Sequence, residues 1–509
     1  MTRTACIASA TAALDDGHLF RDLQRRVAMR TESDAGAAPE TLAPYLHDEM
    51  VPALRALGFD CTVLPNPEPA GGPFLVARRI EDAALPTVLG YGHGDVVSGQ
   101  TAQWRDGLAP FALAAVGDRW YGRGTADNKG QHSINIAALA AVIGARGGRL
   151  GYNATLLLEM GEEAASPGLR TVCEQYRDTL LRADLFLASD GPRVGATRPT
   201  LFLGSRGAVN FTLRLKSRER GYHSGNWGGV LTNPATVMAH AVATLADRHG
   251  RLTVAGLRPP PVSAAVRRVL ADVPVGQDAG DPEIAAQWGE PGLTPAERLM
   301  AWNTLEVLSL GAGNPQRPVN AIPPEAVAHC QLRFVVGTPW QDLAAIVREH
   351  LDVHGFPEME VAITLAGGAT RLDVDHPWVG WAARSIEATC GRPPAILPNL
   401  AGSLPNELFA DVLGLPTLWV PHSYPGCAQH APHEHLLVPV VREGLQIMAG
   451  LYWDLGDAQG LPWHADAASA SASASASASA SASASISAPA APAPSADAPS
   501  RADAAPSLS

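Results

Sequence analysis

Two adjacent glutamates, Glu162 and Glu163, lie in the stretch TLLLEMGEEAASPG, just after the apolar run 155–158. This run has the length and composition of one buried strand. Two like charges at the end of such a strand repel each other unless a cation lies between or beside them. One carboxylate could then bind the cation while the other moves a proton. For the pair alone, the alternative is a solvated acidic turn, which is a common surface feature.

Further imidazoles and carboxylates lie where other predicted elements begin or end. They are His93 and Asp95 after one strand, Asp190 after another, Asp127 before a helix, and His430 in the late segment QHAPHEH. Each has an ordinary explanation alone, such as a helix cap for Asp127 or a turn residue for Asp190. One cause explains them together, because imidazoles and carboxylates that converge at strand ends are ligands for hard or borderline divalent cations.

The number of these groups suggests two ions. The candidate ligands are two imidazoles and three carboxylates: His93, Asp127, Glu163, Asp190 and His430. Zinc usually takes four groups, one of which is water in a catalytic site. Five side chains and a shared water complete two such shells if one carboxylate bridges ions about 3.5–4 Å apart. His433, in the same late segment, stays open as an alternative ligand.

The elements that carry these residues alternate between strand and helix. We predict strands at 85–91, 155–158, 183–188 and 415–420, helices at 18–30, 40–57 and 128–145, and a turn at 120–124. This alternation predicts an α/β fold with a mostly parallel sheet and helices on both faces. In such folds ligands gather at the carboxyl ends of the strands.

The middle of the chain has a different pattern. Polar and apolar residues alternate at 209–216, which is typical of a sheet with one face in water. We predict an α+β domain at 204–367, inserted into a catalytic domain formed by 1–203 and 368–457. Its Pro-rich segment 255–300 is longer than a compact domain needs. The remainder, 458–509, is rich in Ala, Ser and Pro and is predicted to be a disordered tail.

Composition argues against several kinds of partner. The chain has 509 residues, too many for one core, and a net charge of −12, which is unfavourable for binding nucleic acid or an anionic membrane. Its six cysteines are scattered without a C-x-x-C pair, as expected for reduced thiols. We find no signal-peptide core and no run long enough to span a bilayer. A cytoplasmic location is therefore expected.

Five motifs in order resemble those of the dizinc exopeptidase and deacylase family: GHGDVV, GRGTADNKG, EMGEEAASPG, ASDGP and QHAPHE. That family includes glutamate carboxypeptidase, carnosine-type dipeptidases, aminoacylases, acetylornithine deacetylase and succinyl-diaminopimelate desuccinylase. The resemblance covers about residues 18–457. Two departures are EMGEE in place of the common EG-x-EE, and His433 where Asn is more common.

The resemblance implies roles for the candidate residues. His93 and Asp190 would bind one zinc, Glu163 and His430 the other, and Asp127 would bridge them. Asp95 would orient His93. Glu162 would be the general base that takes a proton from water between the ions and returns it to the leaving nitrogen after attack on an amide. The cofactor would be two Zn²⁺ per chain, with Co²⁺ or Mn²⁺ as alternatives.

The inserted domain resembles the lid of this family, which often carries a homodimer contact. Substrate-binding residues implied by position are His223, Asn320, Arg333, Gly402 and Ser403. A surface turn histidine and an ordinary strand-face charge are the alternatives for His223 and Arg333.

The expected function is hydrolysis of an amide bond in a small peptide or N-acyl amino acid. The segment GYHSGNWGG favours the dipeptidase branch, so a dipeptidase or carboxypeptidase-type exopeptidase is the leading hypothesis. An N-acyl-amino-acid deacylase would use the same metal site. A non-catalytic binding protein on the same fold is a third hypothesis, against which the retention of Glu162 and all five ligands argues.

Overall fold

The computed structural model of the chain describes residues 1–33, 39–69, 71–277, 281–457 and 461–463. Of the predicted tail, 458–509, only 461–463 lie within the described residues. The metal-ligand candidates and the predicted substrate-binding residues all lie within them.

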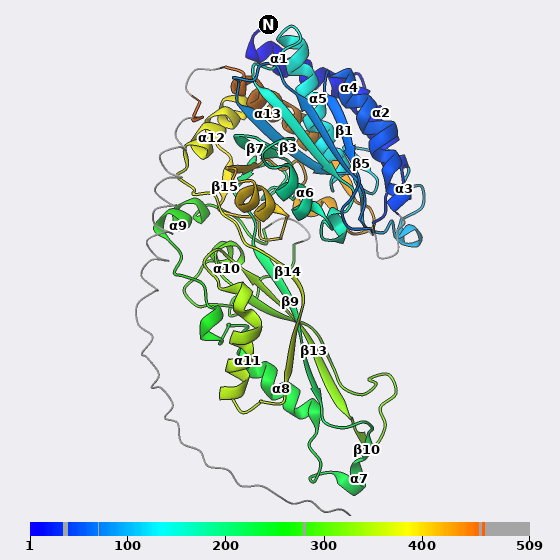
Figure 1. Cartoon of the computed structure of the whole chain (residues 1–509), viewed down its shortest axis with the longest axis vertical. Helices are drawn as coiled ribbons and strands as arrows, with labels where there is room; N and C mark the ends of the chain where they lie inside the picture. Colours follow the sequence, from blue (N-terminus) through cyan, green and yellow to red (C-terminus); the bar gives the residue numbers. More distant parts are fainter. Residues whose placement is uncertain (34–38, 70, 278–280, 458–460, 464–509) are drawn as a thin grey trace, which may run out of the picture. The chain divides into compact units, whose positions relative to one another are not determined.

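An eight-stranded sheet has the strand order β1-β2-β6-β3-β7-β16-β8-β15 (Figure 1). Its strands span Asp60–Leu64 (β1), Phe74–Arg79 (β2), Thr87–His93 (β3), Asn153–Glu159 (β6), Leu185–Ala188 (β7), Thr200–Phe202 (β8), Ala395–Leu397 (β15) and Thr417–Trp419 (β16). The neighbours β6, β3, β7 and β16 run parallel, whereas β1 and β2 add antiparallel strands at one edge. The three strands that precede the ligand candidates are buried along nearly their whole length, as continuous apolar runs predict for strands covered on both faces. The predicted α/β fold with a mostly parallel sheet is confirmed.

Helices cover both faces of this sheet. They include Arg3–Asp15 (α1), His18–Ala28 (α2), Lys129–Ala145 (α5), Leu169–Tyr176 (α6) and Val438–Leu455 (α13). Ile136 and Leu139 of α5 face Leu156 and Leu158 of β6, while α1, α2 and α13 pack around α5 on the same side. The side chain of Leu157 points the other way, into a cluster that includes buried residues of α6. The alternation along β6 therefore gives each face its own apolar layer.

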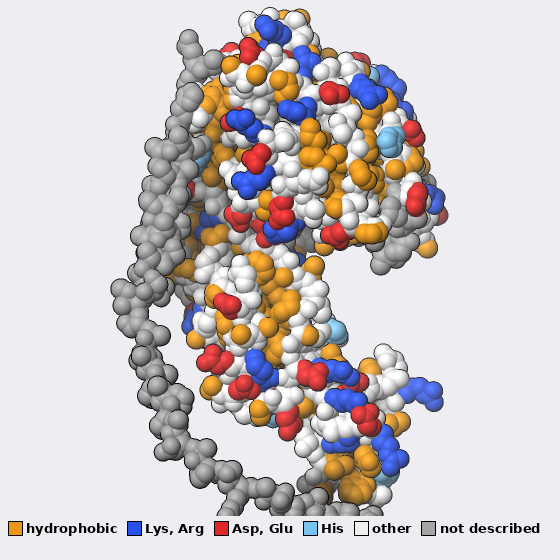
Figure 2. Space-filling model, viewed as in Figure 1, with side chains coloured by type: hydrophobic (Ala, Val, Ile, Leu, Met, Phe, Trp, Pro, Cys, Tyr) orange, Lys and Arg blue, Asp and Glu red, His pale blue; other side chains and the backbone are white. Residues whose placement is uncertain are grey.

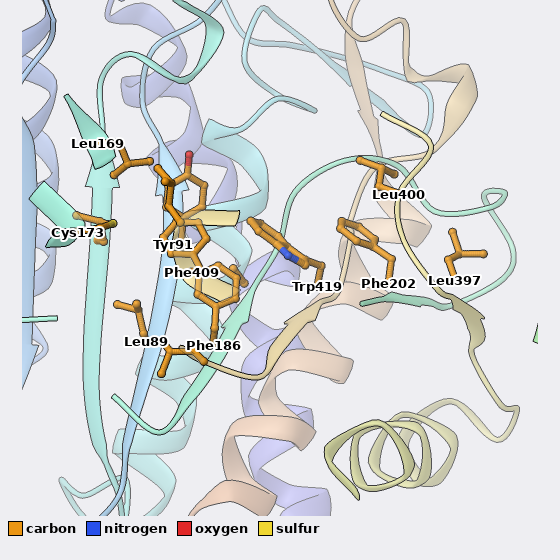
Figure 3. Close-up of a cluster of buried hydrophobic side chains, with 14 of the residues drawn as sticks. Leu89, Tyr91, Leu169, Cys173, Phe186, Phe202, Leu397, Leu400, Phe409 and Trp419 are labelled. Atoms are coloured by element: carbon orange, nitrogen blue, oxygen red, sulfur yellow. The ribbon is translucent and has the colours of Figure 1, made fainter. Parts of the chain in front are cut away.

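Aromatic rings fill the cluster on the α6 side (Figure 3). Phe186 of β7 is 0% exposed; its ring stacks on Phe409 with centroids 4.3 Å apart and lies 4.8 Å from Trp419. Tyr91 of β3 lies 5.0 Å from Phe409. This packing holds β3 and β7 side by side. The candidate ligands His93 and Asp190 lie at or just after the carboxyl ends of these two strands.

Replacing Phe186 with Ala is expected to lower the free energy of unfolding by about 3–5 kcal/mol, because the cavity left between two rings cannot collapse. Urea unfolding of the parent and the variant measures this change. The exposed Val353, at 77% exposure, is a suitable control, and Val353→Ala should stay within about 0.5 kcal/mol of the parent. A loss of less than about 1 kcal/mol for Phe186→Ala would contradict tight packing of this cluster.

Helical structure near the amino terminus extends beyond the predicted elements. The segment 3–15, where we predicted no element, forms helix α1. The predicted helix 40–57 is confirmed as an uninterrupted helical run, which comprises Pro39–Pro44 (α3), a π-helical stretch at Tyr45–Met50 and Val51–Ala56 (α4). Pro44 and Pro52 lie at the two junctions, and each lacks the N–H that a continuous α-helix would use.

The predicted turn at 120–124 is partly wrong, because Arg119–Tyr121 forms strand β5. This strand pairs with β4 (Ala114–Val116) and with β17 (His435–Leu437). The partner β17 lies about three hundred residues later in the chain, so no local pattern reveals it. The pairing brings the segment around His430 next to the segment around Asp127.

A second, four-stranded antiparallel sheet has the order β11-β13-β9-β14. Its strands span Gly207–Lys216 (β9), Thr304–Gly311 (β11), Glu325–Phe334 (β13) and Glu360–Gly367 (β14), and helices Pro234–Leu245 (α8) and Leu343–Val353 (α11) pack on one face. Burial alternates along β9, as its sequence predicts for a sheet with one face in water. These elements lie within 204–367, which stays our prediction for the inserted domain.

Two short helices within that range pack elsewhere. They are Ala264–Leu270 (α9) and Pro295–Met300 (α10). Val266 and Leu270 of α9, with Ala296 and Met300 of α10, belong to the apolar cluster of the eight-stranded sheet. Helices α9 and α10 of the Pro-rich segment 255–300 therefore pack against the core of the first sheet.

Acidic and basic side chains are interspersed on the surface shown in Figure 2. Among the described residues, none of the helices is long and apolar enough to cross a lipid bilayer.

Candidate metal centre

The carboxyl ends of β3, β6 and β7 meet at one edge of the large sheet, because the three strands are parallel neighbours. His93 is the last residue of β3, and Asp190 is the second residue after β7. Glu162 and Glu163 begin a short 3₁₀ turn just after β6. Asp127 lies two residues before α5. The fold thus collects at one edge the side chains that the sequence places at separate strand ends.

Two overlapping groups of potential metal ligands lie at this edge. His93, Asp127 and Asp190 form one group, and Asp127, Glu163 and His430 form the other, with ligand atoms within 4.8 Å of one another in each group. Asp127 belongs to both. Its Oδ1 lies 2.9 Å from His93 Nε2 and its Oδ2 lies 2.9 Å from His430 Nε2. The five residues are those predicted from the sequence, and Asp127 has the position of a bridging carboxylate.

His430, rather than His433, faces the carboxylates. His430 Nε2 is 3.2 Å from Glu163 Oε2. His433 Nε2 accepts a hydrogen bond from the backbone N–H of Arg105, 2.9 Å away, and its ring packs against Trp104. The His433 side chain is therefore engaged outside both ligand groups.

Asp95 connects His93 with the glutamate turn. Its carboxylate is fully buried, and Oδ1 lies 3.4 Å from His93 Nδ1. The same oxygen accepts the backbone N–H of Glu162 at 3.2 Å, while Oδ2 accepts that of Glu163 at 3.1 Å. Ser33 Oγ donates to Oδ2 at 2.7 Å. Asp95 thus holds the His93 ring and the Glu162–Glu163 backbone in one arrangement.

The cluster contains more buried carboxylates than positively charged groups, and this excess shifts the pKa values of its members. Burial, reinforced by Asp127, raises the pKa of Asp190 to about 7. Burial also raises the pKa of Glu162 well above its usual value and raises that of Glu163. Burial opposes charging of His93, yet hydrogen bonds to Asp127 and Asp95 hold its pKa well above the usual range. Without added positive charge, the cluster retains protons.

A divalent cation fits this donor set. Asp190 Oδ2 and Glu163 Oε1 are buried and have no hydrogen-bond partner among the described residues. The Asp190 oxygen belongs to the first ligand group, and the Glu163 oxygen belongs to the second. Buried carboxylate oxygens without donors are costly unless a cation compensates them. Imidazole and carboxylate ligands suit zinc and similar metals.

A cavity of about 840 Å³ opens beside this centre. Its lining includes Glu162 and Glu163 on one side, and Ala208, Trp340 and Ser403 on another. Cavities of about 300–1,000 Å³ commonly hold small ligands. The carboxylate of Glu162 therefore borders a space large enough for a small peptide.

Peptidase family M20/M25/M40 matches residues 89–454, a span that contains every residue of both ligand groups. The chain belongs to this family. It is an M20 peptidase, a metal-dependent peptide hydrolase, which confirms the resemblance inferred from the five motifs.

Several curated relatives are dipeptidases. Rat Beta-Ala-His dipeptidase is 24% identical over 407 residues, covering 77% of this chain and 80% of the relative. Cysteinylglycine-S-conjugate dipeptidase of Corynebacterium striatum is 27% identical, covering 69% and 76%. Succinyl-diaminopimelate desuccinylase of Rhodospirillum centenum is 28% identical, covering 74% and 82%. Among solved structures, the dipeptidase Dug1p of Saccharomyces cerevisiae has a TM-score of 0.74 at 19% identity, covering 90% of this chain and 99% of that one.

The predicted substrate-binding residues of this M20 peptidase lie in two places. Arg333 Nη1 donates to Ser403 Oγ at 2.8 Å, and Ser403 follows Gly402 in a turn beside the 840 Å³ cavity. His223 and Asn320 lie together at the two-stranded pair Tyr222–His223 (β10) and Ala321–Ile322 (β12), where Ser224 N–H donates to Asn320 C=O. Neither is among the described residues that line this cavity within one chain.

Sequence reasoning missed the role of Glu434. Its buried carboxylate accepts the N–H groups of Ala126 and Asp127 at 2.8 and 3.1 Å through Oε1. Through Oε2 it accepts Gly124 N–H at 3.1 Å and Arg123 Nη1 at 2.8 Å. Glu434 thus fixes the backbone of the Asp127 loop. Its place in QHAPHEH, four residues after His430, was the available signal.

A second missed residue is Glu159, the last residue of β6. Its Oε1 accepts Tyr91 Oη at 2.6 Å and Ser166 Oγ at 3.0 Å. Ser166 and its neighbour Ala165 both have positive φ, 51° and 68°, which is unfavourable for residues other than glycine. The bond from Ser166 to Glu159 helps to hold this turn, which carries Glu162 and Glu163 at its start.

Proposed function

We propose that the chain is a dipeptidase-type exopeptidase that uses two divalent cations, preferably Zn²⁺, with Co²⁺ or Mn²⁺ as substitutes. The observation that carries this proposal is the sharing of Asp127 between two ligand groups, beside a cavity bordered by a carboxylate, Glu162, that belongs to neither group. Two ligand groups with one shared carboxylate match the short spacing of two-metal hydrolytic sites.

The proposed ligand sets follow the two groups. His93 and Asp190 would hold one ion, Glu163 and His430 the other, and Asp127 would contact both. When bound, the ions would polarise the scissile carbonyl and lower the pKa of water.

Glu162 is proposed as the general base. Its carboxylate would accept a proton from the attacking water and deliver it to the leaving nitrogen. The raised pKa of Glu162, caused mainly by burial, supports a group that can hold this proton between the two steps. Asp95 is proposed as a positioning residue, since its carboxylate contacts both His93 Nδ1 and the backbone of Glu162.

We also propose substrate contacts for the two groups of residues that the sequence predicts to bind substrate. Arg333, Gly402 and Ser403 would bind the carboxylate end of a small peptide, because Arg333 and Ser403 are already joined beside the site. His223 and Asn320 would act on the site of a second copy of the chain in a homodimer formed through the second sheet. We propose a cytoplasmic location, with no nucleic-acid or membrane partner.

An N-acyl-amino-acid deacylase is the second candidate, favoured by the similarity to the desuccinylase of Rhodospirillum centenum. Both reactions cleave an amide beside a free carboxylate. Turnover of a dipeptide panel against N-acetyl and N-succinyl amino acids separates them. Faster turnover of every N-acyl substrate than of any dipeptide would overturn the dipeptidase proposal.

Removal of metal is expected to abolish hydrolysis of the whole panel, and added Zn²⁺ should restore it. Elemental analysis of the purified protein should find up to two divalent ions per chain. The metal-loaded protein should also melt at a higher temperature than the chelated protein, since binding to the native state alone stabilises by about 2.7 kcal/mol at a hundredfold excess over Kd. Full activity in protein without any divalent transition metal would contradict this prediction.

A further inference from the structure

The segment 281–299 forms one wall of a second cavity, of about 430 Å³. Apolar side chains on this wall include Ile284, Trp288 and Leu299, and Val275 adds a further apolar residue to the lining of the cavity. The facing wall is polar, with Thr304 and Glu306 of β11, Gln331 and Arg333 of β13, and Arg206, the residue just before β9. The volume lies within the range of about 300–1,000 Å³ typical of ligand pockets, so the cavity can hold a whole amino-acid residue.

The turn that carries Trp288 is held firmly by its backbone. Arg298 Nη1 donates to Trp288 C=O at 2.6 Å, and Arg298 Nε donates to Glu290 C=O at 3.0 Å. Gly289 N–H donates to His249 C=O at 2.7 Å. Yet the Trp288 residue remains 52% exposed. An anchored backbone with a half-exposed indole is the arrangement of a binding wall, because aromatic rings supply large contact area at low entropic cost.

The facing wall contains a guanidinium with spare hydrogen-bonding capacity. Arg206 is 6% exposed, and its Nε donates to Ala401 C=O at 2.7 Å. Its Nη1 is buried and has no hydrogen-bond partner among the described residues. Burial, with a further contribution from Arg333, lowers the pKa of Arg206 to about 10. Two arginines, one of them with an unfilled donor, outnumber the single carboxylate of Glu306 in this lining and favour an anionic ligand, and carboxylates match the guanidinium geometry.

One side chain connects this cavity with the metal centre. Ser403 Oγ accepts from Arg333 Nη1 and donates to Arg206 C=O, both at 2.8 Å. Ser403 also lines the 840 Å³ cavity that contains Glu162 and Glu163. Ser403 therefore lies between the polar wall of this cavity and the larger cavity beside the metal centre.

We propose that this second cavity binds the C-terminal residue of the substrate, with its carboxylate between Arg206 and Arg333 and a large apolar side chain against Trp288, Ile284 and Leu299. This inference rests on the proposed peptidase function and gives it a substrate class: dipeptides that end in a bulky apolar residue. The Pro-rich segment 255–300 then acts as a specificity element.

The test compares Ala-Gly, Ala-Leu and Ala-Phe as substrates of the metal-loaded full chain. We expect kcat/KM for Ala-Phe to exceed that for Ala-Gly by at least about tenfold, since each methylene in an apolar pocket contributes a factor of about ten or more. Trp288→Ala should reduce this ratio by about tenfold. Ala285→Leu, which narrows the cavity without removing the indole, should lower kcat/KM for Ala-Phe more than for Ala-Gly. Val353→Ala, outside the cavity, should keep the parental ratio.

Ligand binding gives a second measurement that does not depend on turnover. L-phenylalanine should bind the metal-loaded protein, as measured by calorimetry, and L-phenylalaninamide should bind at least about tenfold more weakly because it lacks the carboxylate.

Equal turnover of Ala-Gly and Ala-Phe, or a ratio unchanged in both Trp288→Ala and Ala285→Leu, would overturn the inference while leaving the peptidase function intact. If no peptide or N-acyl amino acid is hydrolysed, the proposed function fails. Absence of L-phenylalanine binding would then overturn the inference as well.

Discussion

Replacement of Glu162 with Gln is expected to lower turnover by roughly 10²–10⁴-fold while the metal content stays near that of the parent. The substitution keeps the size of the side chain but removes the group that takes and returns the proton. Glu162 belongs to neither ligand group, although its neighbour Glu163 does. KM should change little, because the lost interaction matters chiefly in the transition state. Added Zn²⁺ should not restore activity.

The neighbouring substitution, Glu163→Gln, is the matched control. Glu163 Oε2 lies 3.2 Å from His430 Nε2, and the Asp127–Glu163–His430 group depends on it. This variant should bind its second ion more weakly, and excess metal should partly restore its turnover. Metal stoichiometry and turnover of both variants, measured side by side, decide the assignment. If Glu162→Gln loses metal while Glu163→Gln keeps both ions, the roles of the two residues are reversed.

The grouping of the candidate ligands could be predicted because each candidate lies beside a local pattern. The runs that became β3, β6 and β7 are short, apolar and continuous, and each is followed within a few residues by an imidazole or carboxylate. Parallel strands must place their carboxyl ends at one edge, so the convergence of His93, Glu163 and Asp190 follows from the fold class alone. His430 needed the order of the five motifs, because its segment reaches the site through the pairing of β17 with β5.

The supporting contacts could not be predicted in the same way. Glu434 reaches the Asp127 loop only because β5 pairs with a strand about three hundred residues later, and β5 itself was predicted to be part of a turn. The π-helical stretch within the predicted helix 40–57 is flanked by Pro44 and Pro52, whose effect depends on the packing around them. His223 and Asn320 lie together, but within one chain they do not line the cavity beside the metal centre, so their role stays a proposal that needs a second copy.

The loop of Asp127 depends on one buried carboxylate, and Glu434→Gln is expected to destabilise the protein by about 3–5 kcal/mol. Arg123 is 1% exposed, so this variant leaves its guanidinium buried without a counter-charge. The amide of the glutamine also presents a donor where the carboxylate accepted N–H groups of Gly124 or Ala126. Metal affinity should fall at the same time, because Asp127 is the residue shared by both ligand groups. Urea unfolding of the chelated protein and metal titration measure the two effects separately.

Two further variants separate the stability of the ion pair from the position of the loop. Glu49→Gln also leaves a buried arginine, Arg26, without its partner at 3.1 Å, but Glu49 accepts none of the Asp127-loop amides among its described contacts. It should lose stability and keep parental metal affinity. The double variant Arg123→Met/Glu434→Leu removes both charges of the other pair, so it should recover part of the lost stability. Its metal affinity should remain low, since the N–H groups of Ala126 and Asp127 still lack their acceptor. Parental metal affinity in the double variant would show that the loop holds Asp127 in place without Glu434.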